Sequence, residues 1–119
     1  MDESILATIR KMVGGAENGT AFDVDLIVFI NTCLTALFQI GVGNAPFIIT
    51  GEDETWSDFL GNNYAALEPA QSYIFMKTKL MFDSNSMSGS TISAFERLIS
   101  ECEWRLYVAT NPCDSVLGV

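Results

Sequence analysis

An uncharged run of fifteen residues, 26–40, is the feature that most restricts how this chain can fold. On the side opposite its core stripe, the run carries Val28, Thr32, Thr35 and Gln39, at positions where a solvent-exposed helix normally carries Glu or Lys. The run is also shorter than the roughly 20 apolar residues that cross a membrane, so we expect no membrane partner. It therefore predicts a helix that begins at Asp23 and is covered on most sides, by its own fold or by a neighbouring subunit. Helical spacing predicts its core stripe as Leu26, Phe29, Ile30, Cys33, Leu34, Leu37 and Phe38.

The same spacing predicts three further helices. The first covers residues 2–13, with Asp2 as its cap. A third covers about 64–82 and becomes regular near residue 67, because Pro69 is tolerated only near a helix start. Its buried face is predicted to be Tyr73, Ile74, Met76, Leu80 and Met81.

The last helix is predicted from residue 92 to about 110, with Ser90 or Thr91 as its cap. Its apolar face should comprise Ile92, Phe95, Leu98, Ile99, Cys102 and Leu106. Aromatic residues also recur at helical intervals, and core packing explains them better than a ligand pocket does. These aromatic residues are Phe75, Phe82, Phe95, Trp104 and Tyr107.

Glycine and proline open a long connection after residue 40. Phe47, Ile48 and Ile49 form a short β-branched segment that predicts a strand or hairpin arm. Residues 53–60 predict a loop entering one helical turn, with Trp56 and Phe59 folded back on the core. We therefore predict an all-α domain over residues 1–110, a small bundle of four main helices with a short β-strand or hairpin insertion. Residues 111–119 are predicted to be a C-terminal tail, either flexible or a docking arm.

The net charge of the chain narrows the classes of function that it can have. The 119 residues include 15 Asp plus Glu against 6 Lys plus Arg, a net charge of -9. Proteins that grip nucleic acid need the opposite sign, because cations displace the counterions of the phosphates. An acidic surface is compatible with DNA sliding past, although solubility alone explains the same charge. The three cysteines have no metal-ligand spacing, which fits a reducing compartment.

Residues with catalytic potential are sparse. Histidine is absent, and no phosphate-binding loop or hydrolase motif occurs. The acidic cluster Glu52, Asp53, Glu54 and Asp58 lacks the ligand spacing of a calcium loop. We expect no enzyme, no cofactor and no metal.

Six strings carry a resemblance to a known family: DESILATIRKMVG, FDVDLIVFIN, LTALFQIGVG, TWSDFLG, YIFMKTKLMFD and ERLISECEWRL. In this order and spacing, the chain over about residues 2–107 resembles the small head–tail connector proteins of tailed phages, also known as head-completion or DNA-packaging proteins. One departure concerns the turn after Asp83. Relatives often have a proline there, whereas this chain has Ser84, Asn85 and Ser86, so contacts that need a rigid turn are in question.

The resemblance implies a part of the virion neck, assembled in the cytoplasm of the host bacterium. Family members form a ring, typically twelve-fold, beneath the portal protein. The ring extends the DNA channel and retains packaged DNA until a stopper or tail-completion protein attaches, and it later forms part of the ejection conduit. Phage DNA would pass through it without specific binding.

Under this hypothesis, the segments 42–55 and 83–89 and the tail are the expected interfaces. The candidate interface residues are Val42, Phe47, Ile48, Ile49, Ser84, Asn85, Ser86, Asn111, Pro112, Val116 and Leu117. Candidates for lining the channel are Glu52, Asp53 and Glu54, because a ring of carboxylates would repel phosphates.

Three alternatives stay open. The chain could be another part of the same particle, a stopper or a tail terminator. It could be an acidic module that mimics DNA and inhibits a host protein, which predicts a monomer or dimer. An enzyme would require a bound metal or ligand that the sequence does not indicate.

Overall fold

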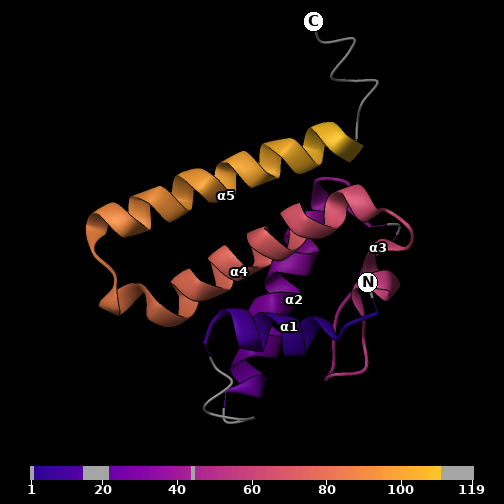
Figure 1. Ribbon diagram of the computed structural model, residues 1–119, viewed down its shortest axis with the longest axis horizontal. Helices are drawn as coiled ribbons and strands as arrows, with labels where there is room; N and C mark the ends of the chain where they lie inside the picture. The colour runs from indigo at the N-terminus through magenta and orange to yellow at the C-terminus, as the bar shows by residue number, and fades with distance from the viewer. Residues whose placement is uncertain (1, 15–21, 44, 111–119) are drawn as a thin grey trace, which may run out of the picture.

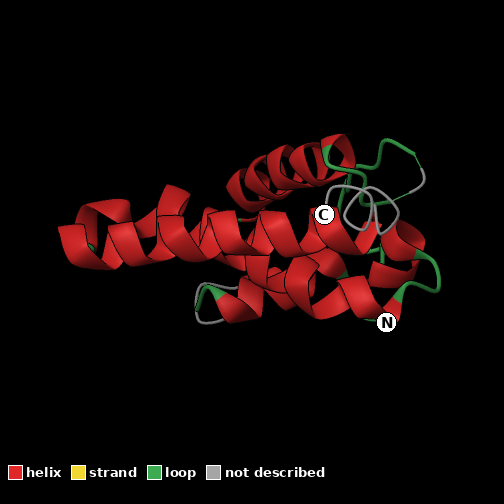
Figure 2. Ribbon diagram, turned by 90° about the horizontal axis from the view of Figure 1, so that it is seen from above, coloured by secondary structure: helices red, strands yellow, loops and turns green. Residues whose placement is uncertain are grey.

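The computed structural model describes residues 2–14, 22–43 and 45–110. Within these ranges the chain is helical and contains no strand, which confirms the all-α prediction (Figure 2). Two short 3-10 turns, η2 (Tyr64–Ala66) and η3 (Ser84–Ser86), precede and follow the fourth α-helix. The α-helices are α1 (Ile5–Met12), α2 (Asp23–Gln39), α3 (Trp56–Leu60), α4 (Leu67–Asp83) and α5 (Gly89–Thr110).

Helix α4 occupies the middle of the molecule. It packs against α5, α2 and α1, while α5 runs alongside α4 as an outer helix (Figure 1). Pro69 is the third residue of α4, where its missing amide proton costs no intrahelical hydrogen bond. The arrangement leaves α2 and α5 as two helices that both contact α4 and each turn another side outward.

Helix α1 starts later than predicted. Ser4 is its cap and accepts a hydrogen bond from the Ala7 amide at 3.1 Å, whereas Asp2 accepts one from the Ser57 hydroxyl at 3.2 Å. Ser4 also forms an isolated antiparallel bridge with Thr55. Thr55 in turn caps α3 in a reciprocal capping box with Asp58. The starts of α1 and α3 are therefore fixed to each other.

The predicted caps of α2 and α5 were wrong. Asp23 is the first residue of α2, not its cap, and its carboxylate instead binds Arg10. Helix α5 begins at Gly89, and its first turn is capped by Ser88, whose hydroxyl accepts a hydrogen bond from the Thr91 amide at 3.2 Å. At α2, the predicted cap Asp23 forms an ion pair with Arg10 instead. At α5, the hydroxyl of Ser88 satisfies an amide of the first turn that has no intrahelical partner.

The strand expected at Phe47, Ile48 and Ile49 is an extended segment without a partner strand in the described chain. A side chain takes the place of that partner. The Ile49 amide donates to Oδ1 of Asn31 at 2.7 Å, and Nδ2 of Asn31 donates to the Ile49 carbonyl at 3.0 Å. Because α2 satisfies this backbone, no second strand is needed.

The core joins the inner sides of the helices, and Trp56 and Phe59 fold into it as predicted. Two predicted core positions were wrong: Met81 is 38% exposed and Leu98 is 48% exposed. The core prediction for the aromatic pair Trp104 and Tyr107 was also wrong, since their exposed fractions are 62% and 39%. Fully buried large side chains include Ile5, Leu6, Ile9, Leu26, Ile30, Leu34, Leu37, Ile49, Trp56, Tyr73, Ile74 and Leu106.

Candidate interaction surfaces

The loop between α2 and α3 divides its apolar residues between core and solvent. Val42 and Ile49 are buried in the core of this chain, and Phe47 packs against Phe59 with ring centroids 5.5 Å apart. Ile48 is 59% exposed. Of these four interface candidates, Ile48 is thus the one whose side chain is available to a partner in this conformation.

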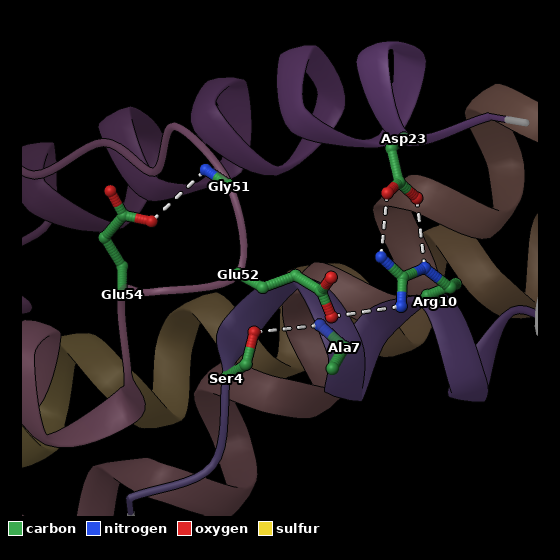
Figure 3. A network of polar contacts seen from close by, with 7 residues as sticks. All are labelled: Ser4, Ala7, Arg10, Asp23, Gly51, Glu52 and Glu54. Atoms are coloured by element: carbon green, nitrogen blue, oxygen red, sulfur yellow. Dashed lines mark hydrogen bonds and ion pairs between the residues drawn. The ribbon is translucent and has the colours of Figure 1, made fainter. Parts of the chain in front are cut away.

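The three channel candidates do not act as one set. Glu52 and Asp53 are exposed, while Glu54 turns back on its own loop. Glu54 accepts hydrogen bonds from the Thr50 amide at 3.0 Å and the Thr50 hydroxyl at 2.8 Å. It also accepts one from the Gly51 amide at 3.3 Å (Figure 3). Slight burial opposes ionisation, but the hydrogen bonds from Thr50 outweigh it and hold the pKa of Glu54 below its ordinary value. Glu54 therefore shapes the loop.

Arg10 ties this loop to two helices. Its guanidinium binds both carboxylate oxygens of Asp23, at 3.0 and 2.8 Å, and reaches Glu52 at 3.3 Å (Figure 3). The hydrogen bonds with Asp23 raise the pKa of Arg10. The sequence did not predict this contact, because helical spacing does not show how α1 and α2 pack against each other. The signal that could have found it is the scarcity of cations, only 6 in the chain.

The turn between α4 and α5 is polar and open. Ser84, Asn85 and Ser86 are exposed, and the Ser86 hydroxyl donates to the Asp83 carbonyl at 3.0 Å. The remaining interface candidates, Asn111, Pro112, Val116 and Leu117, lie outside the described residues.

A polar contact joins α4 to α5 in the interior. The Tyr73 hydroxyl donates to Glu103 at 3.0 Å and accepts from Lys77 at 3.2 Å. Burial, followed by the nearby Glu103 carboxylate, raises the pKa of Tyr73 far above its ordinary value. Tyr73 thus stays a neutral donor in this contact at physiological pH.

Helix α2 exposes an uncharged side, which we call the α2 face: Val24, Val28, Thr32, Thr35 and Gln39. Val24 is 76% exposed and Val28 56%. The hydrogen bonds between Asn31 and Ile49 hold the extended segment against α2, so exposed Ile48 flanks this face.

Helix α5 exposes a second side, which we call the α5 face: Arg97, Leu98, Glu101, Trp104, Arg105 and Tyr107. The rings of Trp104 and Tyr107 stack, with centroids 6.1 Å apart and planes 21° apart. Arg105 and Glu101 form an ion pair at 2.6 Å. This face carries an aromatic pair where the sequence predicted core packing.

The described residues hold no group of three or more His, Cys, Asp or Glu side chains placed to bind a metal ion. Among those same residues, no helix is both long and apolar enough to cross a membrane. One cavity of about 410 Å³ opens between the start of α4 and the end of α5, lined by Tyr64, Ala65, Glu68, Pro69, Ser72, Cys102 and Arg105.

Comparison with known proteins identifies the class. The family model described as phage connector protein matches residues 5–112, nearly the whole chain. The chain therefore belongs to the phage connector protein family, and its role is that of a structural connector between phage head and tail. Neither the curated proteins nor the solved structures gave a match to the chain.

Proposed function

We propose that this protein forms a closed ring, of twelve copies, at the narrow end of the phage portal protein. The ring extends the portal channel, helps to retain packaged DNA until a stopper or tail-completion protein binds, and later conducts the DNA during ejection. The observation that carries the proposal is the family match over residues 5–112. The site of action is the virion neck, after assembly in the bacterial cytoplasm.

The distribution of charge supports a conduit. The chain has a net charge of -9, and Glu52 and Asp53 project from an exposed loop. Carboxylates that face the channel would repel DNA phosphates and let the duplex slide. We assign Glu52 and Asp53 to the channel wall, and Glu54 to the support of their loop.

Exposure supports a division of labour among the interface candidates. Ile48 and the turn of Ser84, Asn85 and Ser86 are accessible, so we assign them to contacts with other neck proteins or with neighbouring copies. Asn111, Pro112, Val116 and Leu117 remain candidates for a docking arm.

Electron microscopy of this protein co-expressed with the portal protein of the same phage tests the proposal. A ring of small helical subunits beneath an intact portal would support it and give the number of copies. Absence of binding across a range of salt concentrations, with the portal intact, would contradict it. Binding to tail-tube protein instead would identify a tail terminator.

A further inference from the structure

The uncharged side of α2 has no cover within the described chain. The sequence left two possible covers for it, the protein's own fold or a neighbouring subunit. In the structure, Val24 and Val28 remain 76% and 56% exposed and no described residue packs over them. Val24 and Val28 lie one helical turn apart and so form a contiguous apolar patch, the kind of surface that marks interaction sites.

A second apolar surface lies on α5. Trp104 is on the side of the helix away from Ile99 and Leu106, which enter the core, and it is 62% exposed. Tyr107, 39% exposed, stacks on it, and Leu98, 48% exposed, lies about 120° round the helix, at the edge of the same face. A large exposed aromatic residue with apolar neighbours is the usual anchor of a protein interface.

Charge indicates that these two surfaces meet each other in different copies. Two chains that each carry -9 repel wherever acidic surfaces approach. The α2 face itself has no charged residue, and exposed Asp25 borders it beside Val24 and Val28. On the exposed side of α5, Arg97 and Arg105 balance Glu96 and Glu101. The α2 and α5 faces are therefore surfaces on which two copies approach without net repulsion.

The two faces differ in the size of their side chains. The first half of the α2 face carries the short side chains of Val24, Val28 and Thr32, and the α5 face projects the indole ring of Trp104. Helix α4 packs against both α2 and α5, so the faces are separate patches of one molecule. A contact between two different patches is heterologous, and such contacts generate rings when the rotation closes.

We infer that the α2 face of one copy binds the α5 face of the next, with Trp104 packed against Val24, Val28 and Thr32. This pairing rests on the proposed ring and specifies how its subunits join. It commits to a second copy of this chain as the occupant of both faces.

Cysteine cross-linking tests the pairing. In a Cys102→Ser, Cys113→Ser background, Val28→Cys and Trp104→Cys are prepared separately, assembled with portal and oxidised. The pairing predicts disulfide-linked dimers in the mixture of the two variants, and monomers in either variant alone. A mixture of Val28→Cys with Lys11→Cys, an exposed position of α1 outside both faces, is the matched control and should stay monomeric.

The outcomes separate this inference from the proposed function. Rings on the portal without mixed cross-links, or with equal cross-linking of each single variant, would overturn the pairing and leave the function intact. Mixed cross-links without a ring on the portal would support the pairing and contradict the function. Loss of both would contradict both.

Charge insertion gives an independent readout. Trp104→Glu should weaken assembly at least tenfold in sedimentation experiments while the far-UV circular dichroism spectrum stays unchanged, because the side chain is 62% exposed. The matched control is Met81→Glu, since Met81 is an apolar residue of α4 that is 38% exposed and outside both faces. Assembly of Trp104→Glu at the affinity of the Met81→Glu control would overturn the pairing.

Discussion

Asn31 gives an extended segment the two hydrogen bonds that a neighbouring strand would otherwise supply. Its amide donates to the Ile49 carbonyl and accepts from the Ile49 amide. Phe47, Ile48 and Ile49 have the composition of a strand, so sequence alone predicted one. The identity of the partner depends on a residue 18 positions away on a helix, and no local pattern encodes that contact.

Replacement of Asn31 by leucine tests this role. The variant leaves both backbone groups of Ile49, a buried residue, without a partner. We expect the free energy of unfolding to fall by about 2 kcal/mol or more, measured by urea denaturation. Thr32→Ala, on the exposed side of the same helix, should change it by less than about 0.5 kcal/mol. Equal effects of the two substitutions would contradict the role.

Cys33 was predicted to be a core residue, and its full burial confirms this. Burial raises the pKa of the Cys33 thiol to about 11, so very little reactive thiolate is present at pH 8. Iodoacetamide at that pH should label the partly exposed Cys102 well before Cys33, as read by peptide mass spectrometry. Early labelling of Cys33 in the folded protein would contradict its burial.

The same shift predicts the pH dependence of stability. The folded protein holds the Cys33 proton more tightly than the unfolded chain does. The stability that this difference contributes is fully present below pH 9 and is lost as the pH rises towards 11. A Cys33→Ala variant should therefore lose less stability than the parent between these two values.

Position 43 requires glycine because of its backbone conformation and because of the adjacent Phe59 ring. Its φ is +89°, and a Cβ there would lie 3.1 Å from the Phe59 ring. Gly43→Ala should lower the free energy of unfolding by about 1–3 kcal/mol, measured by urea denaturation. Gly51→Ala is the matched control, because no atom lies within 4 Å of its added Cβ. A neutral Gly43→Ala would contradict this account.

At the scale of elements, helical spacing predicted all four long helices, and turn residues predicted the short α3. The caps were harder to predict because several candidates adjoin each helix start. At the start of α5, Ser88 caps while Ser90 and Thr91 do not. Which of these hydroxyls caps the helix depends on the path of the preceding turn, because that path sets the residue at which the helix begins.

The width of the buried stripe of α5 was the main error at this scale. The predicted apolar face included both Leu98 and Leu106, but Leu98 is 48% exposed while Leu106 is fully buried. Helix α5 packs mainly on α4, so its buried stripe is narrow. Spacing alone predicts which side of a helix is apolar. It does not predict how wide a stripe of that side the neighbouring helices cover.

A matched pair of leucine truncations measures this difference. Leu106→Ala should lower the free energy of unfolding by about 2–4 kcal/mol, since it leaves a cavity between α5 and α4. Leu98→Ala should cost less than about 1 kcal/mol, because its side chain is already half in water. Thermal unfolding followed by circular dichroism would report both, and similar losses would show that Leu98 is buried in the monomer.

At the scale of the whole molecule, family membership followed from strings spread along most of the chain. The interaction surfaces could be predicted only in part. The uncharged side of α2 was visible in the sequence, but whether the protein's own fold covers it required the structure. The α5 face could not be predicted, because Trp104 and Tyr107 have the spacing of core residues.

Reversal of charge tests the proposed channel wall. Glu52→Lys with Asp53→Lys would place cations along the path of the DNA, and their attraction to phosphates should slow ejection several-fold in a fluorescence assay of DNA release from reconstituted virions. Glu52→Lys also removes the ion pair with Arg10, whose side chain is 15% exposed, so urea denaturation of each variant accompanies the ejection assay. Glu68→Lys serves as the control, and ejection at the control's rate would remove Glu52 and Asp53 from the channel wall.

The central position of α4 has a mechanical consequence. Helix α5 packs mainly on α4, and α4 in turn packs on α1 and α2. A pull exerted on α5 by a neighbour therefore reaches the rest of the subunit chiefly through α4, across the Tyr73–Glu103 hydrogen bond and the packing of Leu106. In the ring that we propose, this helix pair is the joint that would bear shear when packaged DNA exerts pressure on the neck.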